Sequence, residues 1–336
     1  MKIITITDAW TPQVNGVVVT LGRTVQGLRE AGHVVEVIGP DRFRTLPCPS
    51  YPEIRLAIAP YRLLARLASA FAPDTVHVAT EGPLGQAARR WCLAEGLAFT
   101  TAYHTRFPEY VHARVRLPVA ITYGWLRRFH APASAVMVPT RSIHEALRLR
   151  GFRNLALWSR GVDTALFRPG ARLATGWPGP VFMYVGRVAV EKNLEAFLDL
   201  DLPGTKVVVG DGPQRALLQS RFPDAVFTGA KHGEDLAAHF RSADVFVFPS
   251  RTDTFGLVLL EAMASGTPVA AFPVPGPNDV VLPGRSGVLD EDLGAAALAA
   301  RALDRGVVRA CALEYSWQRA TDQFLHNLRP NHASAA

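Results

Sequence analysis

Two cations in the second half of the chain could together bind a diphosphate. The predicted strand Val181–Val185 leads into a loop that carries Arg187 and Lys192, five residues apart. Arginine supplies a planar fork of donors and lysine a compact point charge, and both suit phosphate oxygens. An ordinary solvated loop is the alternative, but the position at the carboxyl edge of a sheet favours a ligand-binding role.

Asp253 and Glu261 are the two carboxylates in the densest group of candidate residues. Asp253 follows the predicted strand Asp244–Phe248, and Glu261 lies on a helix predicted to begin near Phe255 and to end at Gly266. The helix start leaves three backbone N–H groups able to hold phosphate oxygens, those of Phe255, Gly256 and Leu257. A carboxylate on an otherwise apolar helix needs a partner. Glu261 is therefore expected to bind ribose hydroxyls or, alternatively, a neighbouring helix N-cap.

The same two carboxylates also raise the alternative of a glycosidase. Eight residues on one helix span about 12 Å, whereas a glycosidase pair lies roughly 5–9.5 Å apart. A loop at Asp253 could shorten that distance. The spacing therefore disfavours hydrolysis without eliminating it.

The first half of the chain carries two weaker candidates. The loop Asp8–Gly16 lacks the GxGxxG fingerprint of dinucleotide-binding proteins, but Gly16 directly precedes a helix whose free N–H groups suit a phosphate. His104 follows the predicted strand Ala98–Tyr103. Taken alone, Gly16 fits a flexible connector equally well, and His104 fits a structural histidine at a strand end better than a ligand.

Strand-like and helix-like patterns alternate along the chain, which is typical of parallel βαβ units. The predicted strands are Lys2–Thr7, Val34–Gly39, Thr75–Ala79, Ala98–Tyr103, Ala135–Pro139, Val181–Val185, Lys206–Gly210, Ala225–Thr228, Asp244–Phe248 and Pro268–Phe272. We expect an α/β protein of two doubly wound, Rossmann-like domains that face each other across a cleft, where such folds bind ligands.

The domain boundaries follow from a break in this alternation. A stretch rich in glycine and proline, residues 164–180, predicts a linker. Residues 1–165 are expected to form the first domain and residues 166–314 the second. Residues 315–336 hold a last helical stretch that can pack back on the first domain.

Composition and charge exclude several classes of protein. The chain has 336 residues, 49% of them apolar, and no apolar run reaches the roughly 18–20 residues that span a bilayer. Three scattered cysteines argue against a disulfide framework or a zinc site and favour a cytoplasmic location.

The net charge of +7 is uneven, +10 over residues 1–170 and −3 over residues 171–336. The positive charge of the first half indicates either an anionic partner or a solvated surface rich in arginine. The sequence contains no nucleic-acid-binding motif, so we do not expect a nucleic acid as the partner.

The ordered set of motifs closely resembles the retaining glycosyltransferases of family GT4, which have the GT-B fold. The resemblance covers nearly the whole chain and rests on Asn15–Val17, Tyr103–Tyr110, Gly161–Asp163, Gly186-Arg187 with Glu191–Asn193, Gly210–Pro213 and Asp253–Glu261. The segments Ser250–Leu257 and His104–Tyr110 are most similar to the lipid-directed branch. That branch includes sulfoquinovosyl-diacylglycerol synthases and mannosyl- or glucuronosyl-lipid transferases.

The resemblance implies a UDP- or GDP-linked sugar donor held mainly by the second domain and an acceptor held mainly by the first. Its catalytic residues would be Arg187 and Lys192, which bind the diphosphate and stabilise the leaving group, together with Asp253 at the transferred sugar and His104 near that sugar and the acceptor hydroxyl.

The resemblance also implies a set of residues that bind the nucleotide-sugar donor. The amides of Phe255, Gly256 and Leu257 would hold the sugar and the β-phosphate with Asp253. Glu261 would bind the ribose, and Gly16 would cover the same phosphate from across the cleft.

One departure from the family pattern concerns the sugar. The family usually carries Glu-x7-Glu, and this chain has Asp253 at the first place, a carboxylate shorter by one methylene. Because the lipid-directed branch also shows this change, we interpret it as tuning of the donor.

The implied reaction moves a hexosyl or hexuronosyl unit with retention of configuration, and the leaving diphosphate accepts the acceptor's proton. No cofactor or metal is expected, since Arg187 and Lys192 take the place of a Mg²⁺ clamp and no Asp-x-Asp is present where the phosphates should bind.

A membrane lipid is the favoured acceptor. Arg62 and Arg66 lie one turn apart on the predicted helix Tyr61–Phe71, beside leucines and an aromatic ring, which suggests contact with the inner face of an anionic membrane. The stretch Val119–His130 is a second basic and aromatic face. Core helices with arginines that extend to solvent are the alternative for both.

Two further functions stay open besides hydrolysis. A soluble transferase of the same family would build capsule, exopolysaccharide or lipopolysaccharide and would ignore lipid vesicles. A non-catalytic nucleotide-sugar-binding module would bind the donor without turnover, although the intact Arg187, Lys192 and Glu261 disfavour it.

Overall fold

The chain folds into two α/β units, each built on a parallel sheet. The computed structural model describes residues 1–13, 15–48 and 51–331. One unit comprises Met1–Arg160 and Trp317–Ala336, and the other comprises Gly161–Ser316. Both units are Rossmann-like and doubly wound, which confirms the predicted fold class.

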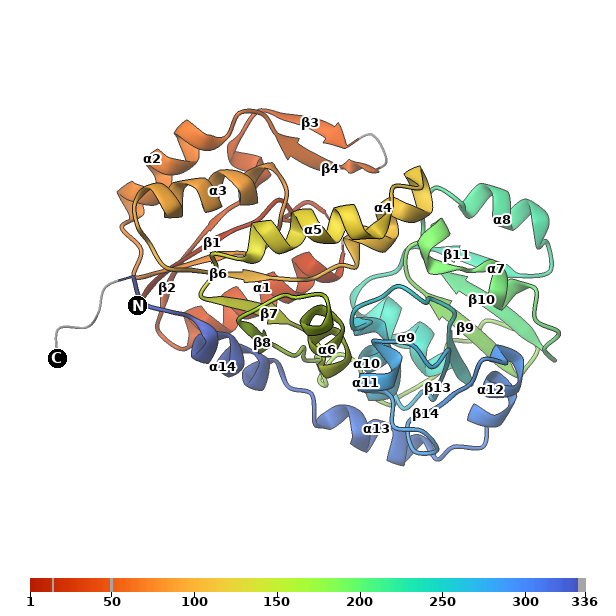
Figure 1. Cartoon of the computed structure of the whole chain (residues 1–336). Helices are drawn as coiled ribbons and strands as arrows, with labels where there is room; N and C mark the ends of the chain where they lie inside the picture. Colours follow the sequence, from red (N-terminus) through yellow and green to blue (C-terminus); the bar gives the residue numbers. More distant parts are fainter. Residues whose placement is uncertain (14, 49–50, 332–336) are drawn as a thin grey trace. The chain divides into compact units, whose positions relative to one another are not determined.

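The sheet of the first unit has the strand order β2-β1-β5-β6-β7-β8 (Figure 1). Its strands are β1 (Lys2–Ile6), β2 (Val34–Ile38), β5 (Thr75–Val78), β6 (Phe99–Ala102), β7 (Ala135–Val138) and β8 (Leu155–Leu157). Its helices are α1 (Gly16–Glu30), α2 (Tyr61–Phe71), α3 (Pro83–Ala94), α4 (Phe107–Val115), α5 (Val119–His130), α6 (Arg141–Leu149) and α14 (Trp317–Asn327). A short antiparallel pair, β3 (Thr45–Cys48) and β4 (Tyr51–Ala57), stands apart from the sheet.

Both faces of this sheet are covered, because successive side chains of a strand point to opposite sides. Ile3 packs with apolar residues of α1 and α14, whereas Ile4 packs with residues of α2 and α3. Leu21, Val25 and Leu28 of α1 are buried in this way. The sheet is thus a rigid platform whose strand ends carry the polar residues.

The second unit repeats this plan with the order β11-β10-β9-β12-β13-β14 (Figure 1). Its strands are β9 (Val181–Val185), β10 (Thr205–Val209), β11 (Val226–Gly229), β12 (Val245–Phe248), β13 (Val269–Ala271) and β14 (Gly287–Leu289). Its helices are α7 (Glu195–Leu198), α8 (Arg215–Arg221), α9 (Gly233–Ser242), α10 (Leu257–Ala264), α11 (Pro277–Val280), α12 (Leu293–Ala300) and α13 (Arg305–Leu313).

The strand order reverses between β1 and β5 in the first unit and between β9 and β12 in the second. At such a reversal the loops after the two central strands turn away from each other, which opens a crevice at the carboxyl edge. The loops after β9 and β12 carry Arg187, Lys192 and Asp253.

The glycine- and proline-rich stretch 164–180 is not a linker, contrary to the sequence prediction. Arg172 pairs with Asp244 at 2.7 Å, and Leu173 N donates to Ser242 Oγ at 2.8 Å, so the stretch lies along the second unit. The chain passes between units after Arg160 and again after Ser316, slightly away from the predicted boundaries. Glycine and proline exclude regular elements from a segment, but they do not prevent an extended segment from packing.

The C-terminal helix α14 belongs to the first unit. Asn327 Nδ2 donates to Leu157 O at 2.8 Å, and Gln323 Oε1 accepts from Ser159 N at 2.8 Å. The Phe324 ring is 4.9 Å from the ring of Trp158. The helix therefore closes the core around the end of β8.

The strands that the sequence pattern missed are short or contain proline. β8 and β14 have three residues each, too few to show a periodicity, and Pro47 and Pro52 lie within the β3–β4 pair. Proline is confined to strand edges because it cannot donate a ladder hydrogen bond.

The three cysteines, Cys48, Cys92 and Cys311, are free thiols. No helix within the described residues combines the length and the apolar character required to cross a bilayer.

We expect Phe324→Ala to lower the free energy of unfolding of the first unit by about 3–5 kcal/mol, because it opens a cavity beside Trp158. Leu149→Ala is the matched control: Leu149 is 72% exposed, so its loss should cost within about 0.5 kcal/mol. Urea titrations of both variants measure the difference. Equal, small effects would show that α14 does not complete this core.

Candidate active site

The loop that carries Arg187 is fixed by glycines that let two backbones touch. A Cβ on Gly210 would lie 1.8 Å from Gly186 O, and a Cβ on Gly212 would lie 2.4 Å from Val188 O. Both glycines have φ near +155°, which L side chains rarely adopt. The Gly-Asp-Gly motif after β10 therefore acts as a support that positions the half-buried Arg187 at the carboxyl edge.

Lys192 and Asp253 form an ion pair between two neighbouring loops. Lys192 ends a short 3-10 helix, Val190–Lys192, and its Nζ lies 2.6 Å from Asp253 Oδ1. Both side chains are largely buried, with 20% and 16% of their surface exposed. Asp253 Oδ2 is buried and accepts no hydrogen bond from the residues that the structure describes. One carboxylate oxygen therefore lacks a hydrogen-bond donor among the described residues.

Further bonds join the same two loops. Thr252 Oγ1 donates to Glu191 O at 3.1 Å, and Asn193 Nδ2 donates to Pro249 O at 3.1 Å. These neutral bonds fix the loops through their backbones, so the Lys192–Asp253 pair is not alone in holding them together.

The helix after Asp253 begins at Leu257, two residues later than predicted, because Gly256 takes a left-handed conformation with φ of 82°. Its buried residues are Leu259, Leu260, Ala262, Met263 and Ala264, whereas Val258 is only partly buried. Within the described chain, three amides at this turn donate no hydrogen bond, those of Phe255, Gly256 and Leu257. Free amides of this kind suit an anion.

Glu261 lies on α10 and is partly buried. The Glu261 carboxyl group forms no hydrogen bond with a described residue, so the alternative of a neighbouring N-cap partner is not observed. Burial raises the pKa of the Glu261 carboxyl to about 7, because the charged form loses water without gaining a partner. A buried carboxyl without a partner points to a hydroxyl-bearing ligand.

His104 lies two residues after the end of β6 in the first unit. Its Nδ1 lies 3.2 Å from Arg160 Nη2, and its ring meets the Trp158 ring edge-on at 5.5 Å. Burial lowers the pKa of His104 well below its usual value, and the Arg160 charge lowers it further. The sequence offered no reason to single out Arg160 beyond its place next to the Gly161–Asp163 motif.

Gly16 is the first residue of α1 and is exposed. The helix is N-capped by Asn15, whose Oδ1 accepts from Val17 N at 3.0 Å and from Val18 N at 3.1 Å. Two of the amides that the sequence predicted to be free are thus occupied, because asparagine at this position caps its own helix.

Asp8, at the end of β1, is a buried carboxylate that the sequence did not mark as functional. It accepts from Thr80 Oγ1 at 2.8 Å and from Leu84 N at 2.9 Å, the latter at the start of α3. Burial raises the pKa of Asp8, and these hydrogen bonds oppose that rise. Its contacts fix α3 against β1, which is a structural role at the strand reversal.

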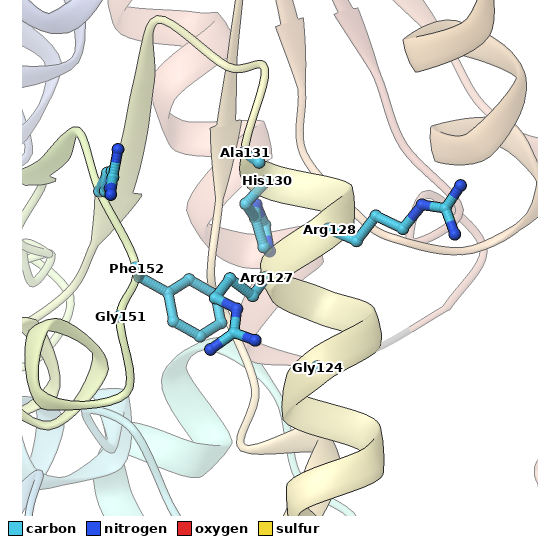
Figure 2. A pocket seen from close by; sticks show the side chains of 8 residues that line it. Gly124, Arg127, Arg128, His130, Ala131, Gly151 and Phe152 are labelled. Carbon is cyan, nitrogen blue, oxygen red and sulfur yellow. The ribbon is translucent and has the colours of Figure 1, made fainter.

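The basic helix α5 ends beside a pocket of about 610 Å³. Its lining residues are Gly124, Arg127, Arg128, His130, Ala131, Gly151, Phe152 and Arg153 (Figure 2). These residues precede β7 and β8, so the pocket lies at the amino edge of the sheet, away from His104. Figure 2 shows Arg127 and Arg128 leaving the helix in different directions. They do not form a joint clamp for one anion.

Arg62 and Arg66 are both exposed on α2, while Leu64 and Ala68 of the same helix are fully buried. The apolar side of α2 is therefore part of the core. Arg62 and Arg90 line a second pocket, of about 600 Å³.

We expect wild-type protein to lose stability relative to Glu261→Gln as the pH rises from about 4.5 to about 7. The folded-state pKa is raised, so the folded chain binds more protons than the unfolded chain in that window and stability falls as they are released. The difference should reach at most about 3 kcal/mol, measured by urea titrations across this range. Parallel curves for the two proteins would contradict a partnerless Glu261.

Comparison with known proteins agrees with this architecture. Residues 14–166 match the family model "Glycosyltransferase Family 4", and residues 179–304 match "Glycosyl transferases group 1". The chain is 33% identical to a GDP-mannose-dependent alpha-mannosyltransferase of Mycobacterium tuberculosis, over 86% of this chain and 83% of that protein. It is 34% identical to the sulfoquinovosyl transferase SQD2 of Arabidopsis thaliana, over 77% and 53%.

Solved structures show the same fold. The sucrose-phosphate synthase of Thermosynechococcus elongatus superposes with a TM-score of 0.78 at 22% identity, over 97% of both chains. The Anabaena protein HepE, solved with UDP and glucose, gives a TM-score of 0.72 at 16% identity, over 97% of this chain and 98% of that one. The motifs, the paired Rossmann-like units and these matches together place the chain in glycosyltransferase family 4, as a GT-B enzyme that uses a nucleotide-sugar donor.

Proposed function

We propose that this glycosyltransferase moves a hexosyl or hexuronosyl unit, with retention of configuration, from a UDP- or GDP-linked donor to a hydroxyl of a membrane lipid. The observation that carries the proposal is the carboxyl edge of the second unit. There the partly buried Lys192–Asp253 pair lies on the loops after β9 and β12, and Arg187 follows β9. Asp253 Oδ2 of this pair accepts no hydrogen bond from a described residue.

Each of these residues has a step in the proposed reaction. Arg187 and Lys192 neutralise the departing diphosphate, and Asp253 and the amides of Phe255, Gly256 and Leu257 hold the sugar and the β-phosphate. Glu261 binds the ribose. Catalysis then consists of positioning and electrostatic stabilisation, without a protein nucleophile.

The acceptor's proton goes to an oxygen of the leaving diphosphate on the same face of the sugar. The glycosidic bond to the acceptor forms as the bond to that oxygen breaks, so donor and product keep the same anomeric configuration. Gly16 and His104 of the first unit are proposed to contact the phosphate and the sugar. Two cations in place of a divalent ion make the reaction independent of metal.

The lipid acceptor is supported by the names of the relatives. They include the sulfoquinovosyl transferase SQD2 and, at 26% identity over 89% of this chain, an alpha-monoglucosyldiacylglycerol synthase of Streptococcus pneumoniae. On this chain, exposed Arg62 and Arg66 of α2 and the pocket beside Arg62 supply positive charge that anionic headgroups would neutralise. We therefore propose peripheral binding to the cytoplasmic leaflet.

Substrate identity is tested by incubating the purified enzyme with UDP- and GDP-linked hexoses, vesicles that contain diacylglycerol, and EDTA. Free nucleotide and a lipid one glycosyl unit heavier should appear together in mass spectra, and the anomeric proton coupling of the product should match that of the donor. Transfer to soluble glycans alone would favour the capsule or lipopolysaccharide alternative, and donor binding without turnover would favour a non-catalytic module.

We expect Arg187→Ala and Lys192→Ala each to lower kcat/KM by about 10²–10³, because each removes a positive charge at the position where the leaving group becomes negative. Arg221→Ala is the matched control, since Arg221 is a 52% exposed arginine of the same unit that pairs with Glu195. Steady-state kinetics with the identified donor provide the measurement. If Arg221→Ala reduced activity as strongly, the loss would reflect net charge rather than the site.

We expect Arg62→Glu/Arg66→Glu to weaken sedimentation with phosphatidylglycerol vesicles by roughly tenfold or more, at about 1 kcal/mol for each basic residue lost. Phosphatidylcholine vesicles should bind both proteins weakly. Arg319→Glu/Arg329→Glu makes the same charge change on exposed residues at and after α14 and should leave sedimentation nearly intact. Unchanged binding of the α2 variant would remove this surface from the proposal.

A further inference from the structure

Arg160 is a buried cation with no counter-ion among the residues that the structure describes. It is 5% exposed, and its Nη1 donates to Trp158 O at 2.6 Å and to Ser159 O at 3.1 Å. Its Nη2 contacts His104 Nδ1 at 3.2 Å, and its guanidinium lies 4.5 Å from the centre of the Trp158 ring. These acceptors are neutral, and no carboxylate of the described residues pairs with it. Burying an unpaired charge is costly, so the arrangement calls for an explanation beyond packing.

The contact with His104 determines where the imidazole proton lies. A guanidinium has five N–H donors and no acceptor, so it can only donate to His104 Nδ1. Nδ1 therefore keeps its lone pair for Arg160, and the ring proton lies on Nε2. Burial lowers the pKa of Arg160 to about 9, which still leaves it protonated at neutral pH.

The surroundings also keep His104 uncharged. Burial is the main cause of its low pKa, followed by the charge of Arg160 and then by His77. His77 itself has a pKa lowered to about 3 and bonds Thr100 Oγ1 through Nδ1 at 2.9 Å. A cationic His104 would lie 3.2 Å from the Arg160 guanidinium, and the two like charges would repel each other.

We propose that Arg160 is a positioning residue that fixes His104 as a neutral imidazole with its proton on Nε2. His104 then offers the substrate a hydrogen-bond donor and has no free lone pair with which to take a proton. This inference rests on the proposed function, because it uses His104 as a residue that contacts the transferred sugar or the acceptor hydroxyl.

The tautomer of His104 decides which group can take the proton of the acceptor hydroxyl. Since His104 cannot act as a general base, the proton of the acceptor hydroxyl must leave to another group, which the proposed mechanism identifies as the departing diphosphate oxygen. His104 instead donates Nε2–H to an oxygen of the sugar or of the acceptor, and this donor is preorganised before the substrate binds.

The first test uses the unmodified enzyme. Long-range ¹H–¹⁵N spectra of ¹⁵N-histidine protein distinguish imidazolium and the two neutral tautomers, and the signals missing from His104→Gln identify His104. We expect the neutral Nε2–H form throughout pH 5.5–8.5. An Nδ1–H tautomer or an imidazolium in that range would overturn the inference. Because this measurement needs no substrate, it stands apart from any failure of the proposed function.

The second test separates positioning from stability. We expect Arg160→Met to lower kcat about 10–100-fold with little change in the donor KM, and to introduce an acid-side ionisation nearer the ordinary histidine pKa of about 6.5. Arg160→Lys keeps the charge and one donor, so it should restore most of kcat and remove that ionisation.

Arg89→Met is the matched control, because Arg89 likewise donates to two backbone carbonyls, Phe129 O and Arg128 O, but lies away from His104. It should reduce stability and leave the pH profile unchanged. A wild-type pH profile in a folded Arg160→Met enzyme would contradict the positioning role. If Arg160→Met does not fold, the tautomer in the unmodified enzyme decides the question.

Discussion

The Lys192–Asp253 ion pair is the interaction around which the second unit's site is arranged. Its two side chains come from the loops after β9 and β12, strands that are neighbours in the sheet although about sixty residues separate them in the chain. Removing both charges from water costs free energy that their attraction only partly offsets. The neutral hydrogen bonds between the same loops and the pairing of β9 with β12 bring the two charges together. Asp253 Oδ2 accepts no hydrogen bond from the described residues, so the arrangement is not optimised for stability alone.

Glycine residues allow the loops at the carboxyl edge of the second unit to lie close together. Gly210 and Gly212 let the loop after β10 touch the loop of Arg187, with no space for a Cβ at either position. Gly256, in a left-handed conformation, turns the chain so that three amides near Asp253 donate no hydrogen bond within the described residues. In the donor site that we propose, these backbone amides and the charges of Arg187 and Lys192 together bind the diphosphate.

The first unit has the same fold, but the charged residues at its carboxyl edge are buried and bonded to other parts of the unit. Its carboxyl edge holds Asp8, which is committed to capping α3, and Arg160, which is committed to backbone carbonyls and to His104. Neither is exposed, so their role is to hold other groups. The exposed arginines of this unit lie instead on helices such as α2, whose apolar side packs in the core. The two units thus share a fold but differ in the residues at their surfaces. The second unit has cations and backbone amides at its carboxyl edge, whereas the first has His104, bonded to Arg160, and a basic surface on α2.

Residue patterns alone predicted the fold class, the family and the strands long enough to show a periodicity, because periodicity and short motifs are properties of neighbouring residues. They also identified Lys192 and Asp253 as candidates, but the contact between the two side chains depends on which strands pair in the folded sheet. The segment 164–180 was predicted as a linker because its glycines and prolines resemble one, and packing on the second unit overrode that local signal. Arg160 carried no signal in the sequence, since a lone arginine reads as solvated until its burial and its distance from His104 are known. Long-range proximity and burial, which set hydrogen bonds and pKa values, are the physical quantities that a pattern of residues does not contain.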